Sequence, residues 1–314
     1  MSPKYSLVIP VYGNASNVKS LFHRLTEIDQ RLNSDLEVLF VIDGSPDNSL
    51  QLIVEELVNV SFSAKVIEHS RNFGSFAAIK TGFINASGKY TAAMAADLQE
   101  PVELIYQFFE LLEKQDYDVA VGVRKSRHDP GISSQLSNSY WGLYKKFIEP
   151  QMPSGGVDIF ALNKEVAKQL VALPESHSSL VGLLFWVGYK RAEVPYDRLE
   201  RVEGKSAWSF KKKLKYLMDS VFSFTSLPIS LILTIGLLGI AVTFVVALFV
   251  LVSWLTGNIS VPGYAAQMIV QLLTGGSLLF AIGVVGTYVW RTYENTKNRP
   301  YALIMSIRDF NSKN

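Results

Sequence analysis

The sequence predicts an α/β domain with a mostly parallel β-sheet, followed by helices that associate with a membrane. Strand-like apolar runs alternate with helical patterns through residues 1–206. Farther along, the stretch Ser220–Trp290 contains no Asp, Glu, Lys or Arg. Only 18% of the 314 residues are charged, and all of these charges lie outside that stretch. The residues outside it therefore carry charge at the usual density of a soluble domain. We therefore do not expect a wholly soluble protein.

Five short apolar runs in the first part of the chain are typical of buried parallel strands. They are Leu7–Val11, Leu36–Ile42, Lys65–Glu68, Tyr90–Ala95 and Asp118–Val123. Helical patterns lie between them at Asn17–Leu32, Ser49–Val58, Ser75–Asn85 and Val102–Lys114. This alternation predicts a parallel sheet covered by helices on both faces. Ligands of such sheets bind beyond the carboxyl ends of the strands.

Polar groups follow four of the predicted strands and together predict a concave polar site. Carboxylate and amide oxygens such as those of Asp97 and Gln99 suit Mg²⁺ or Mn²⁺ bound to phosphates. Asp43 can accept hydrogen bonds from a base or a ribose. The strand-end segments are Pro10–Asn14, Asp43–Asp47, Ser70–Gly74 and Asp97–Pro101.

Several classes of protein and site are excluded by composition. The chain has no cysteine, so disulfides and thiolate zinc sites are impossible. There is no glycine-rich phosphate loop, and the four histidines have no metal-binding spacing. A net charge of +2 gives no indication of a nucleic-acid partner. Tyr5–Tyr12 has no cleavage site and is better interpreted as a first buried strand, which predicts a cytosolic domain.

Two apolar runs, Leu227–Leu255 and Ala266–Trp290, are each long enough to span a bilayer of about 30 Å as a helix. Thr256–Ala265 connects them with turn-forming residues and carries no lysine or arginine, whereas basic residues lie before the first run and after the second. The positive-inside rule then places both ends in the cytoplasm. The alternative is a pair of buried core helices.

The segment Ala207–Thr225 has apolar residues at helical spacing and lysines on another face. It predicts an interfacial amphipathic helix on anionic headgroups, and the alternative is a packed surface helix. The predicted organisation is a cytoplasmic domain at 1–206, an interfacial helix at 207–226, a transmembrane hairpin at 227–290 and a cytoplasmic tail at 291–314. This makes the protein a multi-pass inner-membrane protein with both termini cytoplasmic.

The motifs at the strand ends resemble those of glycosyltransferase family 2. They are Val8–Tyr12, Asp43-Gly44-Ser45, Arg71–Gly74 and Asp97–Pro101. The branch most similar is the polyisoprenyl-phosphate glycosyltransferases. The resemblance implies a GT-A, Rossmann-like fold. It also implies inverting transfer from a nucleotide-sugar, a UDP-hexose or UDP-N-acetylhexosamine, to undecaprenyl phosphate at the cytoplasmic membrane face. The product would serve a cell-envelope glycan.

The resemblance also implies roles for individual residues. Asp97 and Gln99 would face Mg²⁺ or Mn²⁺ and the diphosphate. The catalytic residues would be Asp97 and Asp158, with Asp158 as a base or a positioning group. For Arg198, Arg201 and Lys205, simple attraction to lipid headgroups is the alternative to specific phosphate binding. The nucleotide-binding set is Pro10, Val11, Tyr12, Asp43, Gly44, Arg71 and Asn72. The set for the lipid phosphate or the diphosphate is Arg124, Arg127, Arg198, Arg201 and Lys205.

One position departs from the family pattern, because Ala95 stands where relatives usually carry a metal-site Asp. This change leaves open a catalytically impaired relative that acts as a membrane scaffold or flippase partner. A processive polysaccharide synthase would need a Gln-x-x-Arg-Trp motif and more spans, and neither is present. Small residues such as Gly236 and Gly239 can serve either a homo-oligomer, a tetramer in bacterial relatives, or the hairpin within one chain.

Overall fold

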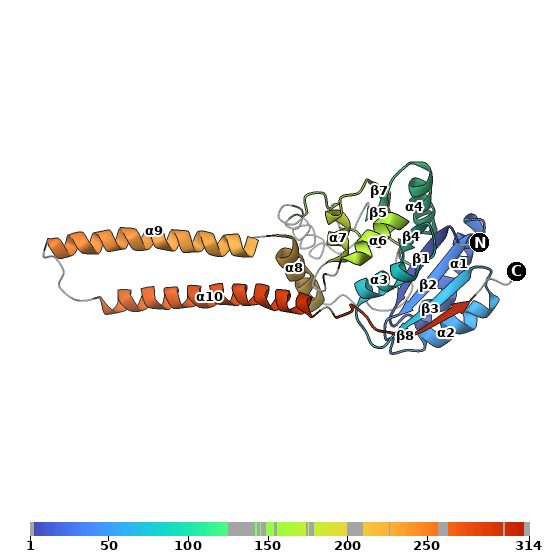
Figure 1. The fold of residues 1–314 in the computed structure, drawn as a ribbon, viewed down its shortest axis with the longest axis horizontal. Helices are drawn as coiled ribbons and strands as arrows, with labels where there is room; N and C mark the ends of the chain where they lie inside the picture. The colour runs from blue at the N-terminus through green and yellow to red at the C-terminus, as the bar shows by residue number, and fades with distance from the viewer. Residues whose placement is uncertain are drawn as a thin grey trace. The chain divides into compact units, whose positions relative to one another are not determined.

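A computed structural model of the chain describes residues 3–124, 142, 145, 149–153, 156–173, 175, 179–199, 210–225, 227–256, 263–297 and 299–310. The chain divides into two compact units. The first comprises residues 1–216 together with 299–314, and the second comprises residues 217–298. Figure 1 labels their helices and strands.

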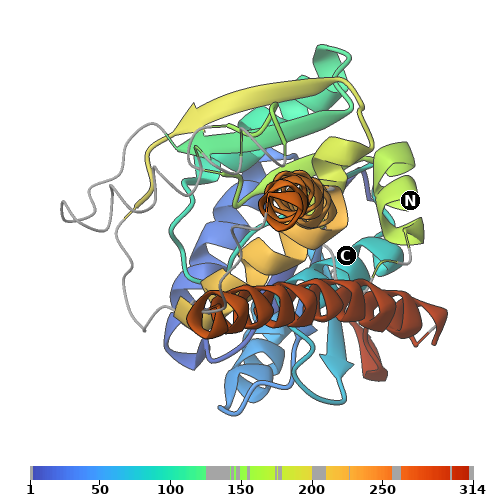
Figure 2. The same cartoon turned by 90° about the vertical axis from the view of Figure 1, so that its left-hand side faces the viewer.

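An eight-stranded sheet forms the centre of the first unit, with the order β7-β5-β6-β4-β1-β2-β3-β8. β1 pairs in parallel with β2 and β4, β2 with β3, and β5 with β7. β6 and β8 run antiparallel to their neighbours. Figure 2 shows β7 (yellow) beside β5 (green) at one edge. The predicted mostly parallel sheet is confirmed. The strands are β1 (Tyr5–Val11), β2 (Leu36–Ile42), β3 (Ser63–His69), β4 (Tyr90–Ala93), β5 (Val119–Arg124), β6 (Phe160–Asn163), β7 (Arg191–Tyr196) and β8 (Ile304–Phe310).

Helices cover both faces of the sheet, as the alternation predicts. On one face, α3 (Ser75–Asn85) contacts β1, β2 and α6 (Lys164–Ala172). On the other, α1 (Val18–Arg31) contacts α2 (Ser49–Glu56) and α4 (Val102–Lys114), and α4 contacts β4 to β7. This unit also contains α7 (Leu180–Trp186), η1 (Ala15–Asn17) and η2 (Leu57–Asn59).

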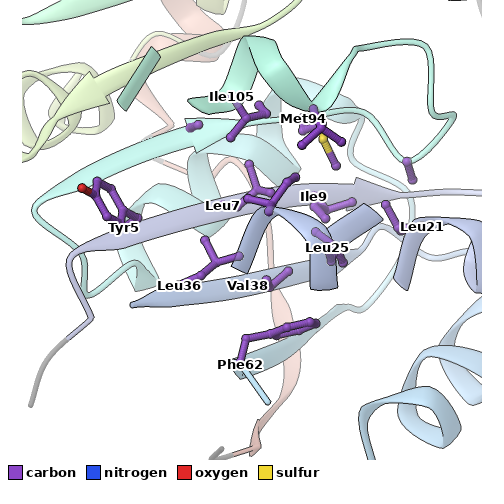
Figure 3. Close-up of a cluster of buried hydrophobic side chains, with 14 of the residues drawn as sticks. Tyr5, Leu7, Ile9, Leu21, Leu25, Leu36, Val38, Phe62, Met94 and Ile105 are labelled. Carbon is purple, nitrogen blue, oxygen red and sulfur yellow. The ribbon is translucent and has the colours of Figure 1, made fainter. Parts of the chain in front are cut away.

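The side chains of β1 alternate between the two faces because a strand has a period of two. Leu7 belongs to the buried cluster that also contains Leu25 of α1 and Ile105 of α4 (Figure 3). Val8 points to the opposite face, where a Cβ placed on Gly82 of α3 would lie 2.1 Å from Val8 Cγ1. The close approach of α3 to β1 therefore requires glycine at position 82.

The last strand comes from a segment that sequence analysis treats only as a tail. Residues 299–310 belong to the first unit, and β8 pairs with β3 although the two are far apart in sequence (Figure 1). The amide of Ser70, just after β3, donates to the carbonyl of Leu303 at 3.0 Å. The C-terminal segment thus reaches the loop that follows β3.

The predicted elements of the first unit are present with small shifts at their ends. The fourth predicted strand ends at Ala93 rather than Ala95, and the fifth begins at Val119 rather than Asp118. The amide of Met94 still donates to the carbonyl of Val8, so the chain leaves the ladder just before the polar motif. Sequence analysis did not anticipate β6, β7, β8, α6 or α7.

The second unit contains the end of α8 (Phe210–Phe224), together with α9 (Leu227–Leu255) and α10 (Tyr264–Thr296). α9 and α10 contact each other. Arg291 of α10 donates to Asp219 of α8 at 2.7 Å. Within the described residues, no helix taken alone meets the length and hydropathy criteria for a membrane span. The two segments Leu217–Phe224 and Leu227–Gly236, which meet at 78°, satisfy the criteria as a pair, by length and composition only.

Candidate active site

The predicted site residues that the structure describes lie at one edge of the sheet. β1 to β5 and β7 run in the same direction, so their carboxyl ends share this edge. β6 runs the opposite way, and Asp158, which precedes it, therefore lies at the same edge. This is the edge where parallel α/β sheets bind their ligands.

The loops after β1 and β2 are joined by Asp47. Its Oδ2 accepts from the amide of Ala15 at 2.9 Å, and its Oδ1 accepts from the hydroxyls of Ser45 and Ser49, each at 2.6 Å. Burial opposes the charged form of Asp47, but these hydrogen bonds outweigh burial and lower its pKa. Sequence analysis includes Asp47 in the strand-end segment Asp43–Asp47 but gives it no role, although an Asp two positions before a predicted helix is a helix-start signal.

The three predicted nucleotide-binding residues at the end of β1 differ in exposure. Val11 is buried in the sheet, Pro10 is half-buried and Tyr12 is 46% exposed. The amide of Tyr12 donates to Asn14 Oδ1 at 3.0 Å, which fixes the backbone of this loop. Tyr12 thus offers an aromatic face on which a base can stack.

Asp43 is buried and holds the loop that follows β3. Its Oδ1 accepts from the amide of Phe73 and its Oδ2 from the amide of Gly74, both at 2.8 Å. His69 Nδ1 lies 2.9 Å from Oδ1, and His69 Nε2 lies 2.9 Å from the hydroxyl of Thr81. Burial opposes the charge on Asp43, but these donors hold its pKa below the usual value. Each carboxylate oxygen of Asp43 therefore accepts at least one hydrogen bond from the protein.

The loop after β2 touches the loop after β3 at Gly44. A Cβ at this position would lie 2.5 Å from Arg71 C and from Asn72 N, and the backbone of Gly44 has φ +59°. Arg71 and Asn72 are exposed, and the Arg71 guanidinium lies 4.1 Å from the centre of the Phe73 ring. The structure therefore brings together four predicted residues, with Asp43 and Gly44 beneath Arg71 and Asn72.

The turn after β4, residues 97–100, carries the most specific predicted motif. Asp97 is half-buried, and Leu98 is buried with a φ of +63°, which is uncommon for a residue other than glycine. Arg24 of α1 donates from Nη1 to the carbonyl of Leu98 at 2.8 Å and to that of Glu100 at 2.9 Å. Nothing in the sequence around Arg24 indicates this contact, because it depends on how α1 packs on the sheet.

Gln99, a predicted metal ligand, contacts the segment that follows β7. Arg198 donates to its Oε1, and its Nε2 donates to the carbonyl of Leu199 at 3.3 Å. The amide of Leu199 also donates to the carbonyl of Gln99 at 2.9 Å. A residue predicted to bind a metal and one predicted to bind a phosphate are therefore direct neighbours.

The end of β5 and the start of β6 bring two further predicted residues together. Arg124 donates from Nη2 to Asp158 Oδ2, and the two form an ion pair. The Asp158 side chain is 38% exposed and that of Arg124 14%, so a ligand at this edge can reach the carboxylate.

Glu100 is a buried carboxyl behind the turn. Burial raises its pKa to about 7, and the charge of Asp97 adds to the effect, whereas Arg198 and Arg124 act in the opposite direction. Its Oε2 has no hydrogen-bond partner within the described residues. Burial also raises the pKa of Tyr196, at the end of β7. The turn thus lies among charged groups that are largely removed from water.

The residues of the turn fit a divalent ion that is shared with a diphosphate. No group of three or more His, Asp or Glu side chains could hold a metal ion in the part of the chain that the structure describes. The motif itself supplies the Asp97 carboxylate and the Gln99 amide oxygen, which here also accepts from Arg198, while Ala95 supplies no ligand. Mg²⁺ is commonly held by one or two carboxylates together with substrate phosphates. Three predicted phosphate contacts, Arg127, Arg201 and Lys205, lie outside the described residues.

Known proteins are similar to this chain in sequence or in structure. The family model described as Glycosyl transferase family 2 matches residues 6–170. The putative glycosyltransferase CsbB of Bacillus subtilis (strain 168) is 35% identical over 95% of this chain and 90% of its own length. The bactoprenol glucosyl transferase of Shigella phage SfX is 28% identical over 96% of this chain and 99% of its own. Among solved structures, mannosyl-3-phosphoglycerate synthase from Rubrobacter xylanophilus is 15% identical, with a TM-score of 0.49 over 70% of this chain and 72% of that one.

Proposed function

The chain belongs to glycosyl transferase family 2, and we propose that it transfers a sugar from a nucleotide-sugar to the phosphate of a polyprenol. The observation that supports a polyprenyl phosphate as the acceptor is the match to a bactoprenol glucosyl transferase over 96% of this chain. A match of that extent includes residues of both units. We propose undecaprenyl phosphate as the acceptor. A UDP-hexose or UDP-N-acetylhexosamine is the donor to test first.

In this proposal the nucleotide lies over the loops that follow β1, β2 and β3. Tyr12, Arg71 and Asn72 are exposed there, so their side chains can contact a base, a ribose or a phosphate. Asp43 contributes by holding the loop that carries Arg71, since its oxygens already accept hydrogen bonds from the protein.

An acceptor phosphate oxygen attacks the anomeric carbon while the bond from that carbon to the nucleoside diphosphate breaks, which inverts the configuration. A phosphate monoester is anionic at neutral pH, because its second pKa is about 6. It therefore needs orientation rather than deprotonation. Asp158 is paired with Arg124, and we assign it to positioning rather than to general base catalysis. Arg124 and Arg198 stabilise the charge that develops on the leaving diphosphate.

Asp97 and Gln99 would hold Mg²⁺ or Mn²⁺, which when bound would neutralise charge on the leaving diphosphate. Because Ala95 contributes no carboxylate, the turn offers few ligands of its own and would rely on the oxygens of the donor. We therefore expect divalent-ion binding to depend strongly on the nucleotide.

We further propose that α9 and α10 span the inner membrane, with α8 at its cytoplasmic surface. A helix of 29 residues such as α9 is about 43 Å long, which exceeds the bilayer core of about 30 Å. Large apolar side chains are exposed along both helices, with Phe249 72% and Leu279 73% exposed. Basic residues precede α9 and follow α10, and none lies between, which favours cytoplasmic ends.

Transfer can be tested with the full chain purified in detergent. The assay contains undecaprenyl phosphate, Mg²⁺ or Mn²⁺ and a panel of radiolabelled nucleotide-sugars, and label is counted in the lipid extract. Asp97→Asn removes the carboxylate of the turn, and Glu110→Gln on the exposed face of α4 is the matched control. We expect label from one donor, retained in the control variant and lost in Asp97→Asn.

Absence of label from every donor, with folded protein, would contradict the proposed transfer. It would favour the alternative of a catalytically impaired scaffold or flippase partner, for which Ala95 is the supporting observation. Label that persists in Asp97→Asn would instead contradict the role of the turn and leave the transfer itself intact.

A further inference from the structure

The turn at residues 97–100 has a backbone that local sequence does not favour. Leu98 has φ +63°, in a region that residues other than glycine rarely adopt. Such conformations persist only where the surrounding structure holds them in place. The Leu98 side chain is 2% exposed, so packing contributes to this hold. The carbonyl groups of the turn show what else contributes.

Three successive carbonyls of the turn accept hydrogen bonds from two different elements. The carbonyls of Leu98 and Glu100 accept from Arg24 Nη1, at 2.8 and 2.9 Å. The carbonyl between them, that of Gln99, accepts from the amide of Leu199 at 2.9 Å. The turn is therefore held by hydrogen bonds from α1 and from the segment after β7. Asp97 is the first residue of this turn, which follows β4.

Arg24 is well placed to act as a fixed support. It lies on α1, whose apolar side chains Leu21 and Leu25 are almost completely buried in the core. An arginine guanidinium carries a positive charge and presents its donors in a rigid plane. Carbonyls bound by a charged donor are held more strongly than those bound by a neutral one.

We propose that Arg24 is a positioning residue of the transferase, which fixes the turn so that Asp97 meets the diphosphate and its divalent ion. This inference rests on the proposed function for its chemistry and on the two carbonyl contacts for its geometry. Arg24 acts through the backbone of the turn, and the nucleotide-sugar need not touch it.

The same helix supplies a matched control. Arg31 also lies on α1, but it is exposed and pairs only with the surface carboxylates Glu27 and Glu103 in the described structure. Arg24→Met removes the donors and keeps an unbranched side chain, and Arg31→Met makes the same change away from the turn. Arg24→Lys keeps the charge on a single nitrogen and tests whether that nitrogen can serve both carbonyls.

The first measurement is amide hydrogen exchange, which needs no catalysis. In Arg24→Met we expect the peptide that covers residues 95–101 to exchange about tenfold faster, the loss expected for a hydrogen bond to a charged group. The peptide that covers residues 70–74 should be unchanged, as should both peptides in Arg31→Met. Unchanged exchange at 95–101 in Arg24→Met would overturn the proposal.

The second measurement is the Mn²⁺ concentration needed for half-maximal binding of UDP by the full chain, read by calorimetry. We expect it to rise about tenfold in Arg24→Met, to recover partly in Arg24→Lys and to stay constant in Arg31→Met. A lower melting temperature with an unchanged Mn²⁺ requirement would mean a merely structural role. If the unaltered chain transferred no sugar while exchange at 95–101 still responded to Arg24→Met, the proposed function would fail and the support by Arg24 would stand.

Discussion

The loop 70–74 and the turn 97–100 lie at the same edge of the sheet, but side chains of opposite charge hold them. Asp43 holds the loop by accepting hydrogen bonds from two of its amides. Arg24 holds the turn by donating to two of its carbonyls. The loop therefore presents its backbone amides to the carboxylate of Asp43, and the turn presents its backbone carbonyls to the guanidinium of Arg24.

The difference matters because only one of the two supports can lose its charge in accessible conditions. A carboxylate is neutralised by acid, whereas a guanidinium stays charged. The two supports also differ in burial, since Asp43 is 2% exposed and Arg24 is half-buried. We therefore expect the nucleotide side of the site to be sensitive to acid and to substitution, and the metal side to be more robust.

The largest effect is expected for Asp43→Asn. One carboxylate oxygen becomes an amino group, so that two donors face each other where the amide of Gly74 now donates. Removing one partner of a buried, hydrogen-bonded pair costs about 3 kcal/mol, which corresponds to a melting temperature lower by about 6–10 °C. Thermal unfolding followed by fluorescence measures the shift. Asp116→Asn, at an exposed carboxylate, should leave the midpoint unchanged, and an equal loss in both variants would contradict the support by Asp43.

A smaller effect is expected for Gly44→Ala, which tests the contact between the loops after β2 and β3. The new Cβ would lie 2.5 Å from the backbone of Arg71 and Asn72. Gly13→Ala is the matched control, because Gly13 has a similar φ of +70° but open space around its Cβ. The shared φ penalty is about 1 kcal/mol, and the clash adds to it only at Gly44, for a total of about 2 kcal/mol.

Chemical denaturation and UDP binding separate the cost of the positive φ from the cost of the steric clash. We expect Gly44→Ala to weaken UDP binding as well as stability, because the displaced backbone carries the exposed Arg71 and Asn72. Gly13→Ala should show the stability loss attributable to φ. Equal losses of stability in the two variants would mean that the close approach at Gly44 is not needed.

Acid provides a reversible test of the same comparison. The pKa of Asp43 is lowered in the folded protein, so its contribution to stability is fully present above the ordinary aspartate pKa of about 3.9. That contribution is lost as the pH falls through the lower pKa of the folded state. The titratable side chain that faces Asp43 is His69, at 2.9 Å. Below about pH 4 we therefore expect loop 70–74 to lose hydrogen-exchange protection before turn 97–100, and simultaneous loss would contradict the comparison.

Sequence analysis could predict which residues lie at this edge, because strand ends can be recognised from the apolar runs that precede them. Asp43, Arg71 and Asp97 follow three such runs, and parallel strands place them together. The antiparallel strand β6 was not predicted, so nothing in the sequence placed Asp158 beside Arg124. Motif resemblance named both residues without indicating their contact.

The supports of the two segments could not be predicted from the sequence. Arg24 lies in an amphipathic helix, where an arginine ordinarily faces solvent. His69 ends a strand and has no metal-binding spacing, and its role depends on two partners, at positions 43 and 81. Such contacts arise from how helices and strands pack, a level of structure that periodicity and motifs do not describe.

The smallest effect is expected at Thr81, which supports Asp43 through His69. With Asp43 ionised and the ring neutral, His69 Nδ1 donates to Asp43 and its Nε2 accepts from the Thr81 hydroxyl. Thr81→Val removes this hydroxyl at nearly constant volume, together with its hydrogen bond to the Tyr301 side chain, and should cost about 1 kcal/mol. Thr26→Val is the control, since that hydroxyl bonds only a carbonyl of its own helix within the described structure. Hydrogen exchange should rise at residues 70–74 and not at 97–100. A rise confined to 97–100 would mean that Thr81 does not act through Asp43 and that the two segments are not held independently.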